Sequence, residues 1–513
     1  MRSTFMGLEA SKRGLFTQQS ALYTTGHNIS NANTLGYSRQ RVNMQATTGY
    51  PMAGLNSPKY PGHLGTGVET GSIQRIRDQF IDRQYRQETN KLGYWESSAK
   101  SISQMEDIMK EPSEYGINQA FTNFWKSMED VIDNPKDAAG RQVLISKGQA
   151  LAESFNYMDK QLKLIQGNIG NEINVSTEKV NSILKQIAAI NKQIQAIEPN
   201  GYVANDLYDA RDVLVDELNE YIPVSISMVK SGGNANAIAE GTMTIKFKPA
   251  NGGDEITLVD GKNYASLASV DTNGKAVDGD VDDQATNGYT EFGAINVSGL
   301  GDPPAGGAAH TLSYNDLEKG KGKLLSLIDA YGHSGGEGLY PEMLKKLDVL
   351  VKEFVNAFNE QHKTGFDADG NQGVDFFTGT TAGDIKVAIS DPKQVAASGV
   401  AGEEGNNDNM RLLAELQSKT QPNLQNATFQ TYYKSLVGQL GVKGQEAISN
   451  AYNSATLHLQ ITNNRASQSS VSLDEEMTNL ITFQQAYNAN ARMITVVDET
   501  LDKIINGLGR VGL

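Results

Sequence analysis

The chain has 513 residues, a hydrophobic content of 38%, an aromatic content of 7% and a net charge of −15 at pH 7. A chain of this length needs several domains, and its acidic balance argues against nucleic acid, because phosphate binding needs clustered Lys and Arg. Cysteine is absent, which excludes disulfides, thiol nucleophiles and cysteine-ligated metals.

The sequence predicts neither a cleaved export signal nor a membrane span. The stretch from Met1 to Phe5 lacks the continuous apolar run and the cleavage site of a signal peptide. No window reaches the roughly 20 apolar residues that a membrane-spanning helix needs. Any export would therefore use a route without a cleaved signal.

An amphipathic helix is predicted over residues 1–30. Its apolar residues recur mostly in steps of three and four and their multiples, which places them on one face; they are Phe5, Leu8, Leu15, Leu22 and Ile29. Residues 31–37 are rich in Asn and Thr, whose side chains bond nearby backbone and favour a turn. The Gly- and Pro-rich segment 49–71 predicts an extended loop or a short hairpin.

Helices dominate the next part of the chain. Two are predicted over 73–109 and 117–132, with Pro112 between them. The longest covers 144–197, a rod of roughly 80 Å at about 1.5 Å per residue. A return helix over 204–221 completes an antiparallel helical hairpin.

Composition changes at Pro223. From there to about Pro304 short β-type runs alternate with Gly- and Asn-rich turns. The segment is acidic and carries no apolar stripe, so we expect a small, solvated β-rich domain that is inserted between helices and faces the surface. Helix resumes over 342–362, and the pattern is again almost wholly helical from Thr428 to the end.

The stretch from Leu473 to Leu508 predicts a long helix with an apolar stripe. Gln484 and Asp498 are its polar breaks, and its apolar positions are Leu473, Met477, Leu480, Tyr487, Ala491, Ile494, Leu501, Ile505 and Leu508. An apolar stripe must be covered by something. Because both terminal stripes lie far in sequence from any plausible core, we expect them to pack against each other and against neighbouring subunits.

No group of side chains predicts catalysis, a cofactor or a metal site. The six histidines include no pair at the i,i+3 or i,i+4 spacing of a helical metal site, so we expect them to have packing roles. The run from Asp367 to Asp375 resembles a Ca²⁺ loop but lacks the later bidentate Glu, which favours a hydrogen-bonded Asx turn. No acid–base pair rises above background, so we do not expect an enzyme.

Two terminal motifs resemble the signatures of the bacterial flagellar rod, hook and hook-associated proteins. The first is Asn28-Ile29-Ser30-Asn31-Ala32-Asn33-Thr34-x-Gly36-Tyr37. The second is Glu476-Met477-Thr478-Asn479-Leu480-Ile481-x-Phe483-Gln484-Gln485-Ala486-Tyr487. The run from Asn205 to Asp212 and the long hairpin are similar to members at the hook–filament junction, whereas 222–330 matches no motif.

The resemblance implies an axial structural protein of the extracellular flagellum, exported unfolded without a cleaved signal. Its partners would be the flagellar hook protein, the second hook–filament junction protein, other copies of the chain, and an export chaperone on the C-terminal region. The implied fold is mainly α with an inserted β-rich domain. Its three domains would be a terminal helical (inner-tube) domain of 1–45 with 466–513, an elongated helical bundle of 46–221 with 331–465, and an inserted β-rich outer domain of 222–330.

The resemblance and the apolar stripes together place the subunit interface on the two ends of the chain. The N-terminal residues expected there are Leu8, Leu15, Leu22, Asn28, Ile29, Asn31, Asn33, Thr34, Gly36 and Tyr37. The C-terminal ones are Leu473, Met477, Leu480, Phe483, Tyr487, Ala491, Ile494, Leu501 and Ile505. Gln484 and Asp498 would either set the register of the helices or face a lumen.

Two other functions compete with this interpretation. A peptidoglycan hydrolase fused to flagellar-type ends would need a catalytic carboxylate pair or a Cys/His site within 222–330, and none is visible there. A hook protein or a distal rod protein would share the terminal motifs. Those proteins lack the long hairpin at 144–221, which decides against them.

Overall fold

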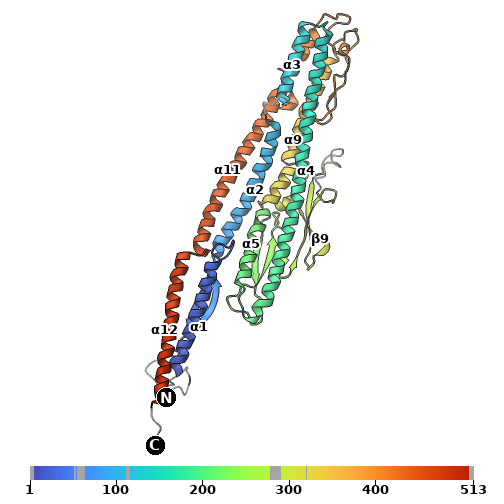
Figure 1. The fold of residues 1–513 in the computed structure, drawn as a ribbon. Helices are drawn as coiled ribbons and strands as arrows, with labels where there is room; N and C mark the ends of the chain where they lie inside the picture. The colour runs from blue at the N-terminus through green and yellow to red at the C-terminus, as the bar shows by residue number, and fades with distance from the viewer. Residues whose placement is uncertain are drawn as a thin grey trace, which may run out of the picture.

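The computed structural model describes residues 5–50, 54, 64–110, 116–277, 290–318 and 320–507. The molecule is a long, thin rod in which helices run along the long axis and both chain ends lie at one tip (Figure 1). Strands lie along one side of its middle. The predicted fold class, mainly α with a β-rich insertion, is confirmed.

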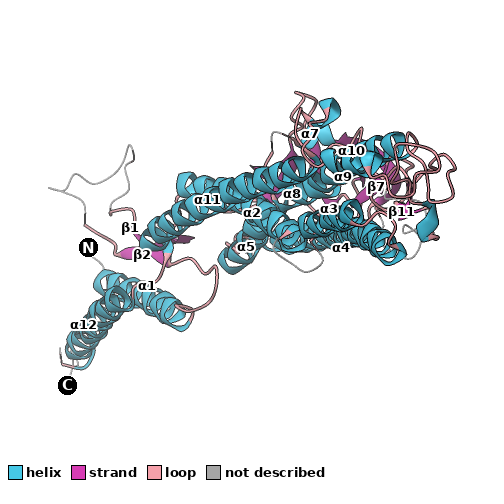
Figure 2. Cartoon of the chain, turned by 90° about the horizontal axis from the view of Figure 1, so that it is seen from above, coloured by secondary structure: helices cyan, strands magenta, loops and turns pink. Residues whose placement is uncertain are grey.

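Helices α1 (Phe5–Ser30) and α12 (Leu473–Asn506) run antiparallel at this tip and form a pair set apart from the other helices (Figure 2). The predicted end of α1 at Ser30 is confirmed, because the turn 31–36 follows it directly. Leu508, the last position of the predicted C-terminal stripe, lies outside the described residues. A short break separates α12 from α11 (Phe429–Ser469), which continues along the rod.

Strands β1 (Gln40–Ala46) and β2 (Val68–Arg75) form an antiparallel hairpin beside α1. The segment 49–71, predicted as an extended loop or a short hairpin, supplies the connection between these strands and the first residues of β2, and its residues 51–53 and 55–63 lie outside the described residues. The helix predicted to begin at residue 73 begins instead as α2 at Gln79 and ends at Met109. The reason is that 68–75 pair with β1, and that Asp78 caps the helix by accepting a hydrogen bond from the backbone two residues further on.

The body of the rod is built along α4 (Ala138–Ile197), a helix of 60 residues. The predicted rod is confirmed but begins earlier, because the carboxylate of Asp137 caps it at the backbone N–H groups of Ala139 and Gly140. Helix α5 (Asn205–Tyr221) returns along α4 as predicted. The other helices are α3 (Ile117–Asp133), α7 (Tyr314–Leu317), α8 (Lys323–Tyr331), α9 (Leu339–His362) and α10 (Asp408–Glu415), with 3₁₀ turns η1 (Glu198–Asn200), η2 (Pro392–Gln394) and η3 (Pro422–Leu424).

The β-rich segment forms two antiparallel sheets, ordered β3-β4-β5-β6 and β7-β8-β9, and a third small sheet pairs β10 with β11. The strands of the first sheet are β3 (Ser225–Val229), β4 (Thr242–Phe247), β5 (Ile256–Asp260) and β6 (Asn263–Tyr264). The remaining strands are β7 (Leu267–Asp271), β8 (Phe292–Gly299), β9 (Ala305–Ser313), β10 (Phe377–Thr378) and β11 (Lys386–Val387).

The expectation that this segment is solvated is wrong for its inner strands. Met243 and Ile245 of β4 and Phe292 of β8 are fully buried and share one hydrophobic core with α4. Asn191 of α4, also fully buried, donates to the carbonyl of Met243 over 2.9 Å and accepts from its N–H over 3.0 Å. Short strands separated by polar turns gave no stripe in the sequence, so the face that packs on α4 was not evident.

The run from Asp367 to Asp375 contains a hydrogen-bonded Asx turn, as predicted. Oδ1 of Asp367 accepts from the backbone N–H groups of Asp369, over 2.9 Å, and Asn371, over 2.8 Å. Asp375 pairs with Lys363 at 2.7 Å. Within the described ranges, no group of three or more His, Asp or Glu side chains is placed to hold a metal ion.

His362, at the end of α9, is fully buried. Its Nδ1 donates to the carbonyl of Val374 over 2.6 Å and its Nε2 accepts from the N–H of Ala396 over 3.0 Å. Burial lowers the pKa of His362 from 6.5 to about 4. As the pH falls, the imidazole of His362 is therefore protonated in the unfolded chain at a higher pH than in the folded chain.

We expect the contribution of His362 to the free energy of unfolding to be complete above pH 6.5. About 3 kcal/mol should be lost as the pH falls from 6.5 to about 4. Urea unfolding at several pH values measures this. His362→Gln keeps one donor and one acceptor without titrating, so this variant should remove that part of the pH dependence. If the free energy of unfolding of the variant still fell with pH as steeply as that of the wild type, His362 would not be the group responsible.

Candidate assembly interface

Small and polar side chains form the closest contact between α1 and α12. A Cβ added to Gly14 would lie 2.8 Å from Oδ1 of Asn490, so a larger residue here would have to displace the Asn490 side chain. The facing pairs are Gly7 with Val497, Gly14 with Asn490 and Asn28 with Glu476. Steps of seven residues along α1 match equal steps back along α12, which is the pattern of an antiparallel coiled coil.

The predicted stripes flank this contact and are only partly covered. Leu8, Leu15, Leu22 and Ile29 are half-buried. The buried positions of α1 instead include those one residue before the last three of them, Gly14, Ala21 and Asn28. On α12 the half-buried residues are Leu480, Phe483, Tyr487, Ala491, Ile494 and Leu501, and the exposed ones include Leu473, Met477, Gln484, Asp498 and Ile505. Within α12 the single buried residue is Glu476.

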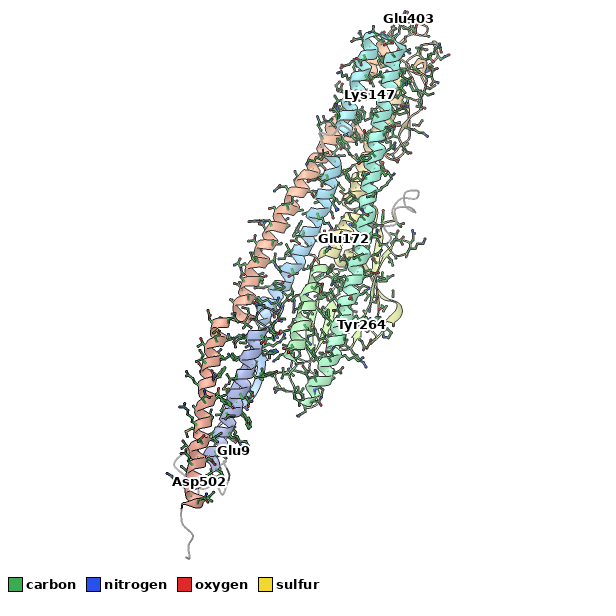
Figure 3. The ribbon with its side chains drawn as sticks, viewed as in Figure 1. Glu9, Lys147, Glu172, Tyr264, Glu403 and Asp502 are labelled. Carbon is green, nitrogen blue, oxygen red and sulfur yellow. The ribbon has the colours of Figure 1, made fainter. Side chains whose placement is uncertain are left out.

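Helix α1 turns a second apolar stripe away from α12. Tyr23 is 77% exposed, Phe16 is 55% exposed, and Phe5 is also exposed. These residues share one face of the helix, since they are separated by seven and eleven residues, close to whole numbers of turns. Tyr23 lies about two and a half turns after Gly14, so this face is opposite Gly14. Figure 3 shows side chains projecting outward from both helices near Glu9 and the chain end. Further exposed apolar residues on α12 are Ile481, Met493, Val496 and Ile504.

This outer stripe is not among the faces predicted from the sequence. Phe5 was grouped with the leucines, and Phe16 and Tyr23 were not assigned to any face. The signal was available, because the spacing of seven and eleven residues repeats an aromatic side chain on one face.

Asn28 links both terminal helices to the turn that follows α1. Its Nδ2 donates to the carbonyl of Gln40 over 2.9 Å and to Oε2 of Glu476 over 3.1 Å. Its Oδ1 accepts from the Tyr37 hydroxyl over 2.8 Å and from the N–H of Gln40 over 3.0 Å. Burial, with nearby carboxylates, raises the pKa of Tyr37, so its hydroxyl stays a donor. Asn28 thus makes all these bonds within one chain, and its role between subunits stays a prediction.

The rest of the N-terminal motif shapes the turn. Asn31 Nδ2 donates to the carbonyl of His27 over 3.1 Å, and Thr34 Oγ1 donates to Asn31 Oδ1 over 3.2 Å. Gly36 has a φ of +78°, and an added Cβ would collide with Val213 of α5. Asn33 is exposed. The motif therefore sets how closely the turn approaches the body.

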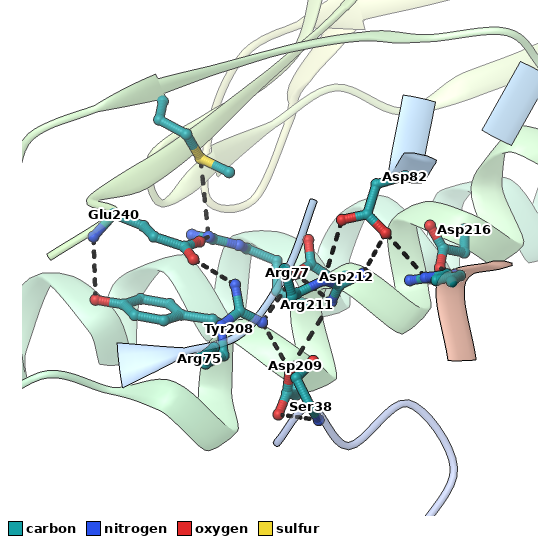
Figure 4. A network of polar contacts seen from close by, with 12 residues as sticks. Ser38, Arg75, Arg77, Asp82, Tyr208, Asp209, Arg211, Asp212, Asp216 and Glu240 are labelled. Atoms are coloured by element: carbon teal, nitrogen blue, oxygen red, sulfur yellow. Dashed lines mark hydrogen bonds and ion pairs between the residues drawn. The ribbon is translucent and has the colours of Figure 1, made fainter. Parts of the chain in front are cut away.

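A buried network of charges, which we call the joint, connects the terminal helices to the body (Figure 4). Oγ of Ser38 donates to Asp209 over 2.7 Å, and Nε of Arg39 donates to Glu476 of α12 over 2.7 Å. Its members come from β2, α2 and the segment between them, from α5 and α11, and from the segment before β4. They are Arg75, Arg77, Arg86, Arg211, Arg465, Asp82, Asp209, Asp212, Asp216 and Glu240.

Asp212 lies at the centre of the joint. It accepts from Arg75 over 2.9 Å, Arg77 over 2.8 Å and Arg86 over 3.2 Å. Burial raises its pKa, but the arginines outweigh burial and hold the pKa of Asp212 below its usual range. The joint pairs equal numbers of arginines and carboxylates, so its buried charges are compensated. The run from Asn205 to Asp212, noted in the sequence, supplies three of its members.

The contacts define a class of protein. Two paired terminal helices with open apolar faces, tied by buried ion pairs to an elongated body, are the features of a structural subunit that assembles with other chains. None of the helices in the described ranges is long and apolar enough to cross a membrane.

Comparison with known proteins identifies the family. The family described as flagellar hook-associated protein FlgK helical domain matches residues 102–377, and the flagellar basal body rod FlgEFG protein C-terminal family matches residues 463–507. Flagellar hook-associated protein 1 of Bacillus subtilis is 42% identical over 99% of both chains. The Escherichia coli protein of the same name is 27% identical, over 96% of this chain and 98% of its own.

A solved structure shares the fold. The flagellar hook junction protein FlgK from Burkholderia pseudomallei matches with a TM-score of 0.62 at 14% identity, covering 76% of this chain and all of the other. The chain belongs to the flagellar hook-associated protein 1 family and is a structural protein of the flagellar hook–filament junction. The family resemblance noted in the sequence is confirmed. The matched helical domain includes the long hairpin, which favours this family over hook and distal rod proteins.

Proposed function

We propose that copies of this chain join hook to filament by packing the open faces of their terminal helices against one another. The observation that carries the proposal is α12, which is rich in apolar residues yet buries only Glu476 within its own chain. Partial cover by α1 leaves apolar residues exposed around both helices. Neighbouring copies would remove this apolar surface from water.

The same proposal gives the three predicted domains distinct roles. The terminal domain of 1–45 with 466–513 would form the inner tube, and the bundle of 46–221 with 331–465 would surround it. The insert of 222–330 would face outward. The joint supports a rigid link between the first two, because it lies where the terminal helices meet β2, α2 and α5.

The flagellar hook protein and the second hook–filament junction protein would contact the two ends of the assembled ring. The names of the relatives, which are hook-associated or hook junction proteins, support this placement outside the cell. Export would proceed without a cleaved signal, with a chaperone on the open C-terminal helix. Function as a structural subunit, without catalysis, agrees with the roles of the charged residues in the joint.

A deletion strain tests the proposed function. Cells that lack this chain should keep their hooks and release filament subunits into the medium, because the filament has no junction on which to assemble. Expression of the intact chain should restore filaments and swimming. Filaments that remain attached to hooks in the deletion strain would contradict the proposal.

Limited proteolysis tests the state of the free subunit. We expect the isolated monomer to lose about the first 40 and the last 45 residues while the body survives, because a helix pair with little buried surface opens readily. Electrophoresis and mass spectrometry of the fragments measure this. Terminal helices that resist the protease as well as α4 would show that the ends need no neighbour to be stable.

A further inference from the structure

The second half of α11 exposes large apolar side chains. Tyr452 is 72% exposed, Leu459 is 61% exposed and Ile448 is 51% exposed. They are separated by four and seven residues, close to whole numbers of turns, so they share one face of the helix. Beyond Ala447, the one buried residue of α11 is Ser454. We call the surface around Ile448, Tyr452 and Leu459 the outer face of α11.

This part of the chain is almost free of charge. Charged residues make up 20% of the whole chain, but between Ala447 and Leu473 the only Asp, Glu, Lys or Arg is Arg465. The Arg465 side chain is 19% exposed and pairs with Asp82 and Asp216 of the joint, so it does not serve the outer face. Helix surfaces that face water normally carry charges. Exposed aromatic and aliphatic side chains without charged neighbours are instead the composition of a protein–protein interface.

An exposed tyrosine elsewhere on the rod has different surroundings. Tyr157 of α4 is 59% exposed, but Glu153 and Lys160 lie about one turn before and after it and are exposed as well. A single apolar residue among charges is ordinary for a surface that faces water. The outer face of α11 therefore differs from such a surface in its missing charges, and not only in its apolar residues.

The position of the outer face indicates what covers it. Helix α11 runs along one side of the rod and not across a tip (Figure 1). In a ring or tube of elongated subunits, the side of one subunit meets the side of the next, whereas other proteins of the axis meet the tips. The uncharged surface also continues into the terminal helices, because Met477–Ala491 and Gly14–Ser38 contain no Asp, Glu, Lys or Arg.

We propose that the outer face of α11 packs against the side of a second copy of this chain in the junction. The inference rests on the proposed function, because copies must stand side by side, and it adds a contact outside the terminal helices. Covering Ile448, Tyr452 and Leu459 removes apolar surface from water. No charge of the outer face loses its hydration in the process, so this contact avoids the main cost of burying a polar surface.

Photo-cross-linking of assembled flagella tests this proposal. The full chain carries Tyr452→benzoylphenylalanine, or Leu459→benzoylphenylalanine if the first variant does not attach filaments. We expect irradiation to join two copies of this chain, as mass spectrometry of the cross-linked peptides shows, and the product to be lost when the monomer is irradiated at the same concentration. A product with the hook protein or with the second junction protein would overturn the proposal. So would the absence of any product although filaments are attached, and that result would leave the packing of the terminal helices untouched.

A charged variant gives a second test, with the photoreactive residue now at Ile448. Tyr452→Glu with Leu459→Glu should lower the yield of the joined copies at least about tenfold, because the contact would bury two unpaired carboxylates. Tyr157→Glu is the matched control and should leave the yield unchanged. Circular dichroism checks that both variants are folded. An unchanged yield in the double variant, or an equal loss in Tyr157→Glu, would show that the outer face makes no specific contact and would overturn the proposal.

Discussion

Replacing Phe16 and Tyr23 by glutamate is expected to leave the monomer folded and to abolish attachment of the filament. Both side chains are exposed on the face of α1 opposite α12, so the change leaves the contact between the two helices intact. It replaces the Phe16 ring, whose centroid lies 6.0 Å from Nζ of Lys12, by a carboxylate that can pair with the same lysine. Burying a charge in each intersubunit contact, in place of an aromatic ring, should cost several kcal/mol per copy. Swimming in soft agar and electron microscopy of flagella measure the effect, and circular dichroism checks the fold.

Tyr202→Glu provides the matched control for this variant. Tyr202 is 69% exposed, but it belongs to the turn between α4 and α5 and not to α1 or α12. Its replacement should leave swimming intact. Normal filaments in the Phe16→Glu, Tyr23→Glu double variant would exclude the outer stripe of α1 from the assembly interface.

Asp212→Asn is expected to destabilise the chain by about 3–5 kcal/mol, because it leaves buried arginines without their central carboxylate. Arg75 and Arg77, whose side chains are 5% and 9% exposed, both donate to Asp212. Urea unfolding followed by circular dichroism measures the loss. The terminal helices should also lose their fixed orientation, since Asp209 on the same helix holds Ser38.

Glu217→Gln is the control for this variant on the same helix. Its carboxylate pairs with Lys179 at 2.7 Å, but both side chains are at least one-third exposed. Solvent screens such a pair, so its loss should cost less than about 1 kcal/mol. A cost for Asp212→Asn no larger than that of Glu217→Gln would show that the joint does not hold the rod together.

The long helices could be predicted from the sequence because their apolar spacing repeats over many turns. Helices α1, α4 and α12 matched their predictions over the described residues, apart from the earlier start of α4. The start of α2 was misplaced, because the strand pairing of Val68–Arg75 with β1 is a long-range contact that local spacing does not carry. The burial of β4 and β8 was missed for the same reason.

The candidate interface was only partly predictable. The spacing of apolar residues predicted where the terminal helices lie. It did not predict which of two neighbouring stripes on α1 meets α12. That choice depends on the close approach at Gly14, which a search for apolar residues overlooks. The joint was invisible as a unit, because its arginines and carboxylates come from elements as distant as β2 and α11. The run from Asn205 to Asp212 was the only part of the joint noted in the sequence.

The central claim is that neighbouring copies cover the open faces of α1 and α12. The chain has no cysteine, so a single Gln19→Cys substitution places one thiol on the exposed face of α1. Its rate of reaction with a maleimide is to be compared between the monomer and flagella that carry the assembled junction, with Tyr202→Cys as the control. We expect the reaction at Gln19→Cys to be at least about a hundredfold slower in the assembly than in the monomer, and the rate at Tyr202→Cys to be unchanged. Equal rates at Gln19→Cys in the monomer and the junction would contradict the central claim.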